Sequence, residues 1–209
     1  MSESPAHTPV NLYDLSLPEL TARLAEWGQP AFRARQVWEW LYRHFAADPA
    51  EMTSLPAALR QRLAAETTLT IGDIVLRQNS RDGQTTKVLF RMGDGQFIET
   101  VLMAYEKRRT LCISTQAGCA MGCVFCATGQ MGFMRHLSTG EIVGQVTYFA
   151  RELATRGEHV TNIVMMGMGE PLHNYDNTLA AVDRLTDPAG LNLGARKITI
   201  STVGLVGGI

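Results

Sequence analysis

Apolar residues recur at helical spacing through the first 70 residues, which predicts three short amphipathic helices. The first begins at a capping box of Ser16 and Glu19 and ends at Gly28. The second follows Pro30 and the third follows Pro56. Their apolar stripes are Leu17, Leu20 and Leu24; Phe32, Val37, Leu41 and Phe45; and Leu59 and Leu63. Three such helices can bury a modest core, so residues 1–70 are expected to form a small helical domain.

From residue 71 the apolar period becomes two, which is typical of strands. Asp82-Gly83 and Gly93-Asp94-Gly95 separate the alternating runs, and both have the composition of hairpin turns. Residues 71–104 are therefore predicted to form three antiparallel strands.

Strands then alternate with helices. The predicted order is a strand at 111–115, a helix at 139–155 opened by a capping box of Ser138 and Glu141, a strand at 160–166, a helix at 177–186 and a strand at 197–201. This alternation predicts an α/β fold with a parallel sheet. Three strands are fewer than a closed barrel needs, so residues 105–209 are expected to form a partial (β/α) barrel, and the sequence is expected to be part of a longer one.

The composition excludes several classes of protein. With 45% hydrophobic and 19% charged residues, the 209-residue chain has the composition of a soluble globular protein. No apolar run is long enough to span a bilayer, and residues 1–10 lack the pattern of a secretory signal. A cytoplasmic location is therefore expected. The net charge of -1 excludes a chain-wide basic field for nucleic acid, so any RNA contact must come from local patches.

All four cysteines lie within fifteen residues, at Cys112, Cys119, Cys123 and Cys126. The last three form a C-x-x-x-C-x-x-C motif, which can bind three irons of a cubane cluster and leave the fourth iron open to a small molecule. A zinc site completed by Cys112 or His136 is the alternative, although zinc loops favour paired C-x-x-C knuckles. Buried inert thiols are a further alternative.

The motif after the first strand of the alternating series resembles the signature of the radical S-adenosylmethionine (SAM) enzymes. The longer run from Gln116 to Gly129, together with Gly167-Met168-Gly169-Glu170-Pro171, is similar to the RlmN family of adenosine C2 methyltransferases that act on 23S rRNA and tRNA. The resemblance extends over nearly the whole chain. Related enzymes that act at adenosine C8 typically have a small residue in place of Pro171, which favours C2.

The resemblance implies a set of cofactors and site residues. Cys119, Cys123 and Cys126 would hold a [4Fe–4S] cluster, and its open iron would bind SAM. A radical route would suit adenine C2, which is not nucleophilic. The expected SAM contacts are Gly169, Glu170 and Ser201. Glu99 is the expected proton acceptor, with a pKa raised into a range useful for a base if it is partly buried. Cys112 is the expected thiol that breaks a covalent enzyme–RNA bond.

The resemblance also implies partners, namely 23S rRNA, tRNA and an electron donor such as flavodoxin. A monomer without membrane contact is expected. The amino-terminal helices and the run Lys107, Arg108 and Arg109 are candidates for RNA contact. The family carries the methyl group on a second cysteine near the carboxyl end, but no cysteine follows Cys126, so this chain is not expected to complete methyl transfer. Another radical SAM reaction and a zinc-stabilised RNA-binding module remain the alternative functions.

Overall fold

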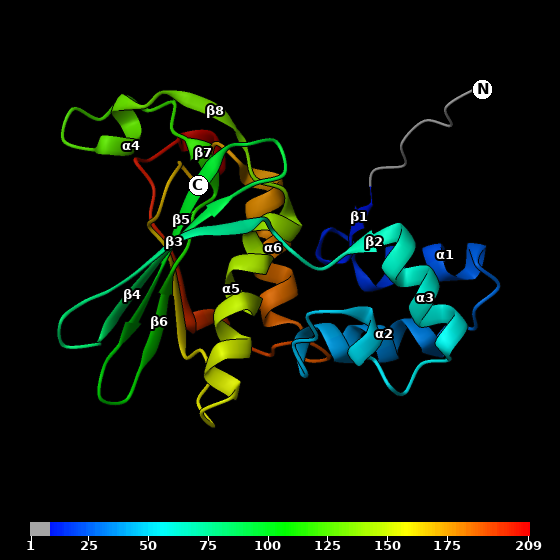
Figure 1. Cartoon of the computed structure of the whole chain (residues 1–209). Helices are drawn as coiled ribbons and strands as arrows, with labels where there is room; N and C mark the ends of the chain where they lie inside the picture. Colours follow the sequence, from blue (N-terminus) through cyan, green and yellow to red (C-terminus); the bar gives the residue numbers. More distant parts are fainter. Residues whose placement is uncertain (1–8) are drawn as a thin grey trace, which may run out of the picture.

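The computed structural model describes residues 9–209 and places a helical part beside an α/β part (Figure 1). The expectation about a leader rests mainly on residues 1–8, which lie outside this range. The helices are α1 (Leu17–Glu26), α2 (Phe32–Tyr42), α3 (Ala57–Glu66), α4 (Ala127–Gln130), α5 (Thr139–Ala154) and α6 (Tyr175–Thr186), with 3-10 turns η1 (Leu12–Asp14), η2 (Pro49–Glu51), η3 (Ala195–Lys197) and η4 (Val206–Gly208). None of the helices in residues 9–209 combines the length and apolar character needed to cross a membrane.

The strands fall into three sheets. They are β1 (Val10–Asn11), β2 (Thr67–Thr68), β3 (Asp73–Asn79), β4 (Thr85–Arg91), β5 (Phe97–Ala104), β6 (Arg109–Cys112), β7 (Gln116–Gly118), β8 (Phe133–His136), β9 (Asn162–Met165) and β10 (Ile198–Ile200). The main sheet has the order β10-β9-β6-β5-β4-β3. Its β3 to β6 neighbours are antiparallel, while β6, β9 and β10 are parallel. The predicted hairpins and the predicted parallel strands thus share one continuous sheet, and the division into domains at residues 70 and 104 stays a prediction.

The helical part confirms the expected helix starts. The Ser16 hydroxyl accepts a hydrogen bond from the Glu19 N–H at 3.2 Å, and the Glu19 carboxylate accepts one from the Ser16 N–H at 2.7 Å. The stripe predicted for α2 is wrong at Phe32, which is 54% exposed. Phe32 is the first residue of α2, and the helix instead packs Trp38 and Tyr42 into the core beside Val37 and Leu41.

One face of the main sheet is covered by α5 and α6, and the other face is open. Leu111 and Ile163 are fully buried on the covered face, whereas their neighbours Cys112 and Val164 point to the open face and are only partly buried. The edge strand β3 is exposed along its whole length, so the alternation at Ile74 does not produce a buried face there. A β-bulge between Ile74 and Leu76 shifts the register of this strand.

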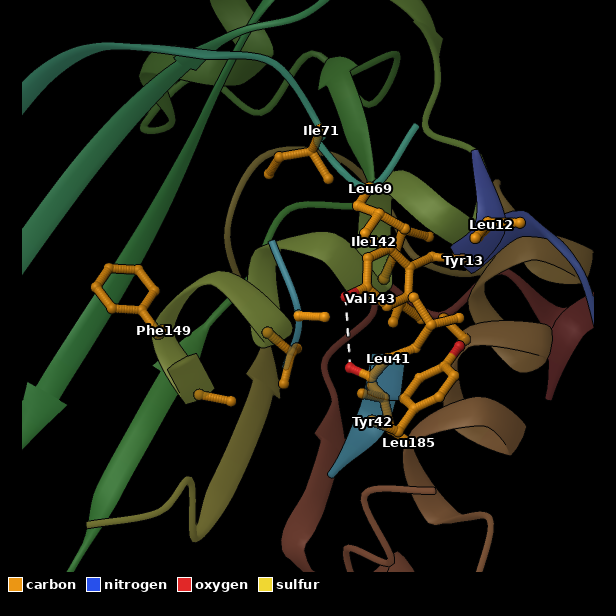
Figure 2. Packing of buried hydrophobic residues seen from close by; sticks show 14 of the residues in the cluster. Leu12, Tyr13, Leu41, Tyr42, Leu69, Ile71, Ile142, Val143, Phe149 and Leu185 are labelled. Carbon is orange, nitrogen blue, oxygen red and sulfur yellow. Dashed lines mark hydrogen bonds between the residues drawn. The ribbon is translucent and has the colours of Figure 1, made fainter. Parts of the chain in front are cut away.

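The helical part packs closely against α5. A Cβ atom at Gly144 would lie 1.8 Å from Cγ2 of Ile71, so only glycine permits this contact. At the start of α5 the Gly140 N–H donates a hydrogen bond to the Asp14 carboxylate at 2.6 Å. Figure 2 shows the core that results, in which Tyr13 and Leu41 meet Ile142 and Val143 of α5 and Leu185 of α6. The two parts of the chain therefore share one hydrophobic core.

The strand predicted at 111–115 is interrupted in the structure. Strand β6 ends at Cys112, and the chain leaves the main sheet to form β7, which pairs with β8 as a separate antiparallel ribbon. Strand β8 was not predicted, because the run from Phe133 to His136 does not alternate in polarity. The ribbon carries the cysteine motif in the loop between its two strands.

The contact between α5 and Ile71 predicts the effect of Gly144→Ala. In an ordinary helix this change is favourable by about 1 kcal/mol. Here the new methyl group would meet the stiff, β-branched Ile71, and overpacking of this kind costs about 1–3 kcal/mol. We therefore expect the free energy of unfolding in urea to fall. The double variant with Ile71→Ala should show less than the sum of the two losses, whereas additive losses would contradict the contact.

Candidate functional site

The cysteine motif forms a compact loop between β7 and β8. The Cys119 N–H donates to the Gly132 carbonyl at 2.9 Å, and the Cys126 N–H donates to the Cys123 carbonyl at 3.0 Å. Cys126 immediately precedes the short helix α4. All three thiols are free and partly buried. These two backbone hydrogen bonds thus help to fix the loop that carries the three cysteines.

The three cysteines line one cavity of about 330 Å³. The cavity also contacts Gly169 and Glu170, which follow β9, and Ser201, which follows β10. Its apolar wall includes Met165, Met166 and Phe125. Because the carboxyl ends of parallel strands meet at one edge of a sheet, the loops after β9 and β10 reach the cysteine loop there. The structure therefore brings together six of the eight site residues expected from the sequence.

Glu170 is a buried carboxylate that joins two loops of the cavity. One oxygen accepts a hydrogen bond from the Leu172 N–H and the other from the Val203 N–H, each at 2.9 Å. The side chain thereby links the loop after β9 to the loop after β10. Each carboxylate oxygen has a second lone pair, so Glu170 can still accept from a ligand in the cavity while it holds these loops.

Gly169 is required by packing inside the protein. Its φ is +101°, and a Cβ atom there would lie 2.5 Å from Cβ of Gln116. The glycine lets the loop after β9 lie directly on β7. Gly169 also lines the cavity, so packing against Gln116 is a reason for this glycine that adds to its expected contact with SAM.

Glu99 and Cys112 lie outside the residues that line this cavity. In the register of the sheet, Glu99 pairs with Leu89 and Cys112 pairs with Val101, which places both side chains on the open face. The Glu99 carboxylate is 40% exposed and lies 2.8 Å from the Lys87 ammonium. Glu99 is thus partly buried and paired with a cation, and its role as a proton acceptor stays a prediction.

Cys112 has an environment that disfavours the thiolate. Burial raises the pKa of its thiol, and a backbone hydrogen bond with Met166 only partly opposes this shift. The protonated thiol is therefore the main form at neutral pH, so a thiol exchange at Cys112 would need a base to remove the proton.

The basic run lies at the opposite end of the parallel strands. Arg109 forms a salt bridge with Glu158, whose carboxylate accepts a hydrogen bond from the Arg109 Nε at 2.9 Å. Lys107 and Arg108 line a separate cavity of about 440 Å³ at the amino ends of the strands, together with His159 and Lys197. Arg109 is thus less available for RNA than the sequence suggested.

Several polar residues that position the site were not predicted. Gln116, Gln145 and Asn174 are buried and bind backbone or side-chain groups at the edge of the sheet, and His136 and His173 both bind Gln116. Gln145 was detectable, because it interrupts the apolar stripe of α5 formed by Ile142 and Val146. Gln116 and the two histidines are distant in sequence, and no local pattern indicates their contact.

The donor set separates the two metal hypotheses. A zinc ion needs four ligands at about 2.0–2.3 Å from one point. Within residues 9–209, no three His, Cys, Asp or Glu side chains are arranged as ligands of one metal ion. In a cubane cluster each thiolate binds a different iron, so the three sulfurs stay apart. Three thiols around a cavity therefore fit a [4Fe–4S] cluster. The two candidates for a fourth zinc ligand are placed elsewhere, because Cys112 lies in the sheet and His136 is bound to Gln116.

Comparisons with known proteins agree with this chemistry. Residues 10–69 match the family model of the ribosomal RNA large subunit methyltransferase N-terminal domain, and residues 113–207 match the radical SAM superfamily. A curated relative from Chloroflexus aurantiacus, a probable dual-specificity RNA methyltransferase RlmN, is 54% identical over 95% of this chain and 54% of its own length. The dual-specificity RNA methyltransferase RlmN 1 of Myxococcus xanthus is 53% identical over 98% of this chain and 57% of its own length.

A solved structure is similar throughout. The crystal structure of a radical SAM methyltransferase from Sphaerobacter thermophilus superposes with a TM-score of 0.92 at 53% identity, covering 95% of this chain and 58% of that one. The chain thus spans little more than half the length of the relatives that it matches.

Two matched cysteine variants test the ligand set. Cys123→Ser removes a thiol from the cavity, whereas Cys112→Ser changes a thiol in the sheet. After anaerobic loading with iron and sulfide, we expect Cys112→Ser to keep the metal content of the unchanged chain and Cys123→Ser to lose most of it, measured by elemental analysis. Equal losses in both variants would instead favour a four-cysteine zinc site.

The burial of Cys112 also predicts its reactivity. Because its thiol pKa is raised, the fraction of thiolate should still be increasing above the ordinary pKa of a cysteine. We expect its rate of alkylation by iodoacetamide, followed by peptide mass spectrometry, to be low at pH 7 and to continue rising beyond pH 9. A rate that levels off near pH 8 would contradict the environment described.

Proposed function

We propose that this chain, which matches the models of the RlmN N-terminal domain and of the radical SAM superfamily, belongs to the RlmN family and holds the cluster and SAM for methylation of C2 of an adenosine in 23S rRNA and tRNA. The observation that carries the proposal is the single cavity shared by Cys119, Cys123 and Cys126 and by the loops that follow β9 and β10. The substrates and the reaction are taken from the relatives, of which this chain spans little more than half.

The residues of the cavity divide the work of binding. Cys119, Cys123 and Cys126 would hold the [4Fe–4S] cluster with one iron free of protein ligands, and the cluster would supply the one-electron reduction that cleaves SAM. Glu170 fixes both loops through the Leu172 and Val203 N–H groups and presents its remaining lone pairs to the ammonium of SAM.

Ser201 and the backbone at Gly169 provide further polar groups for SAM. Ser201 is exposed and its hydroxyl can donate or accept, while Gly169 has no side chain to block the cavity. Met165 and Met166 supply apolar contact and help to exclude water from the bound cofactor. In these assignments SAM would contact polar groups on one wall of the cavity and apolar side chains on the other.

Glu99 and Cys112 act on the RNA side of the reaction in this proposal. Both point to the open face of the sheet, where a nucleotide can approach without crossing α5 or α6. Glu99 accepts a proton from the adenine ring, and its carboxylate lies 2.8 Å from the Lys87 ammonium. Cys112 breaks the covalent bond between enzyme and RNA after its thiol has lost a proton.

The proposed partners are RNA and a one-electron donor such as flavodoxin, with the protein acting as a monomer in the cytoplasm. The four free cysteines suit a reducing compartment. Another radical SAM reaction would use the same cavity with a different substrate. A zinc-stabilised RNA-binding module is disfavoured by the arrangement of the cysteines.

Anaerobic reconstitution tests the proposal. With iron and sulfide, we expect about four irons for each chain and no zinc requirement. The EPR signal of the reduced cluster should shift when SAM is added, because SAM binds the open iron. The same chain should not methylate RNA, because none of its four cysteines is free to carry the methyl group. Three are assigned to the cluster, Cys112 is assigned to breaking the enzyme–RNA bond, and no cysteine follows Cys126.

Other outcomes would decide between the hypotheses. One zinc for each chain, no iron and no response to SAM would leave the binding-module hypothesis. A four-iron cluster whose EPR signal ignores SAM would contradict the open iron. Methylated adenosine formed by this chain, detected by mass spectrometry, would contradict the expectation that methyl transfer needs a further cysteine after Cys126.

A further inference from the structure

Beside the cavity, Gln116 binds two histidines at once. Its side-chain nitrogen lies 3.1 Å from Nδ1 of His136 and 3.0 Å from Nδ1 of His173. The other end of the same amide is fixed, because the Glu170 N–H donates to the Gln116 oxygen at 2.8 Å. A backbone N–H can only donate, so the oxygen must face Glu170 and the NH2 group must face the histidines.

This arrangement determines the protonation of both rings. The two hydrogens of the Gln116 NH2 group point at the two Nδ1 atoms, so each Nδ1 must accept. A neutral imidazole with an accepting Nδ1 carries its proton on Nε2. Burial and the neighbouring His173 lower the pKa of His136, which agrees with a neutral ring. The pair therefore presents two Nε2–H donors, and neither makes a hydrogen bond within residues 9–209.

An exposed phenylalanine completes an aromatic cluster with these rings. The Phe133 ring centroid lies 5.1 Å from that of His136 and 5.4 Å from that of His173, and the two histidines are 4.8 Å apart. Phe133 is 39% exposed. We call Phe133, His136 and His173 the aromatic platform. It offers an open aromatic surface and uncharged donors side by side.

The platform adjoins the cysteine cavity. Phe133 follows Gly132, whose carbonyl binds the Cys119 N–H. Gln116 is in contact with Gly169 and Glu170, which both line the cavity. A ligand on the platform would thus lie next to the place proposed for SAM.

The local charge favours a base over a phosphate. Arg135, between Phe133 and His136, is bound by two carboxylates, those of Glu141 and Asp94. One cation against two anions leaves a net negative charge, which repels phosphate. Neutral rings with N–H donors instead suit a flat, uncharged heteroaromatic group that has acceptor atoms.

From these observations we propose that the aromatic platform of Phe133, His136 and His173 binds an unpaired nucleobase of the RNA next to the reacting adenosine. The inference rests on the proposed function, because it takes RNA as the substrate. It adds a base-binding surface whose donors are oriented by Gln116, a positioning residue that touches no substrate itself.

The test compares two single-stranded probes of equal length on the 209-residue chain. One is a fluorescently labelled hexa-adenylate, and the other is the same ribose-phosphate chain without bases. Fluorescence anisotropy should show tighter binding of the hexa-adenylate. Phe133→Ala should weaken that binding by about 5-fold to 100-fold, the usual effect of losing one stacked base, and should leave the abasic probe unaffected. Phe133→Leu keeps the apolar bulk and should weaken binding in the same direction.

Tyr105→Ala is the matched control. Tyr105 is an exposed aromatic residue, 46% accessible, in the turn between β5 and β6 at the opposite end of the sheet. It should leave the affinity for both probes unchanged. Equal affinity for the two probes, or equal effects of the Phe133 and Tyr105 variants, would overturn the platform while RNA binding stands. No binding of either probe would overturn both the platform and the RNA part of the proposed function.

The orientation by Gln116 has a separate readout. Long-range 1H–15N NMR spectra distinguish the two neutral tautomers of histidine and the charged form. At pH 7.5 both His136 and His173 should be neutral with the proton on Nε2. A proton on Nδ1 of either ring would overturn the assignment of its donor.

Discussion

The buried amide of Gln145 holds the sheet and the site together. Its oxygen accepts from the Thr100 hydroxyl and the Ser114 N–H, each at 2.8 Å, and its nitrogen donates to the Ser114 carbonyl at 2.9 Å. Ser114 lies where the chain leaves the main sheet, and its backbone groups would otherwise be buried without partners. The Ser114 hydroxyl in turn donates to the Glu99 carbonyl and accepts from the Met168 N–H. One helix side chain thereby fixes β5, the start of β7 and the loop after β9.

Two other buried side-chain amides bind backbone groups around the cavity in the same way. Asn174 donates to the carbonyls of Thr115 and Leu137, each at 2.8 Å, and Gln116 accepts from the Glu170 N–H. These are backbone groups near the point where the chain changes from the main sheet to the β7–β8 ribbon. Buried amides are costly unless fully bonded, so each such side chain admits few arrangements. These side chains thus add to the backbone hydrogen bonds from Thr115 and Gln116 to the Met168 carbonyl in holding the ribbon that carries the cysteines.

Sequence patterns predicted those parts of the fold that depend on residues close together in the chain. Both capping boxes, the hairpin turns and the parallel order of β6, β9 and β10 are confirmed. The exposure of Phe32 and of β3 was missed, because periodicity shows which face is apolar but not how far a core extends. The site followed the same rule. Spacing of the cysteines predicted their common cavity, while the contacts of Gln116 with two histidines join residues 20 and 57 positions away.

The two faces of the sheet explain why the expected residues separate into two groups. The residues proposed to bind the cofactors belong to loops beyond the strand ends, where three segments meet around the cavity. Glu99 and Cys112 belong to the strands themselves and can reach a ligand only through the open face. A substrate that contacts both groups must therefore extend from the open face to the end of β6, where the chain turns into β7. Gln116 begins β7, and its oxygen faces Glu170 of the cavity while its nitrogen faces the aromatic platform. Gln116 is therefore a direct hydrogen-bonded link between the loop after β9 and the two histidines.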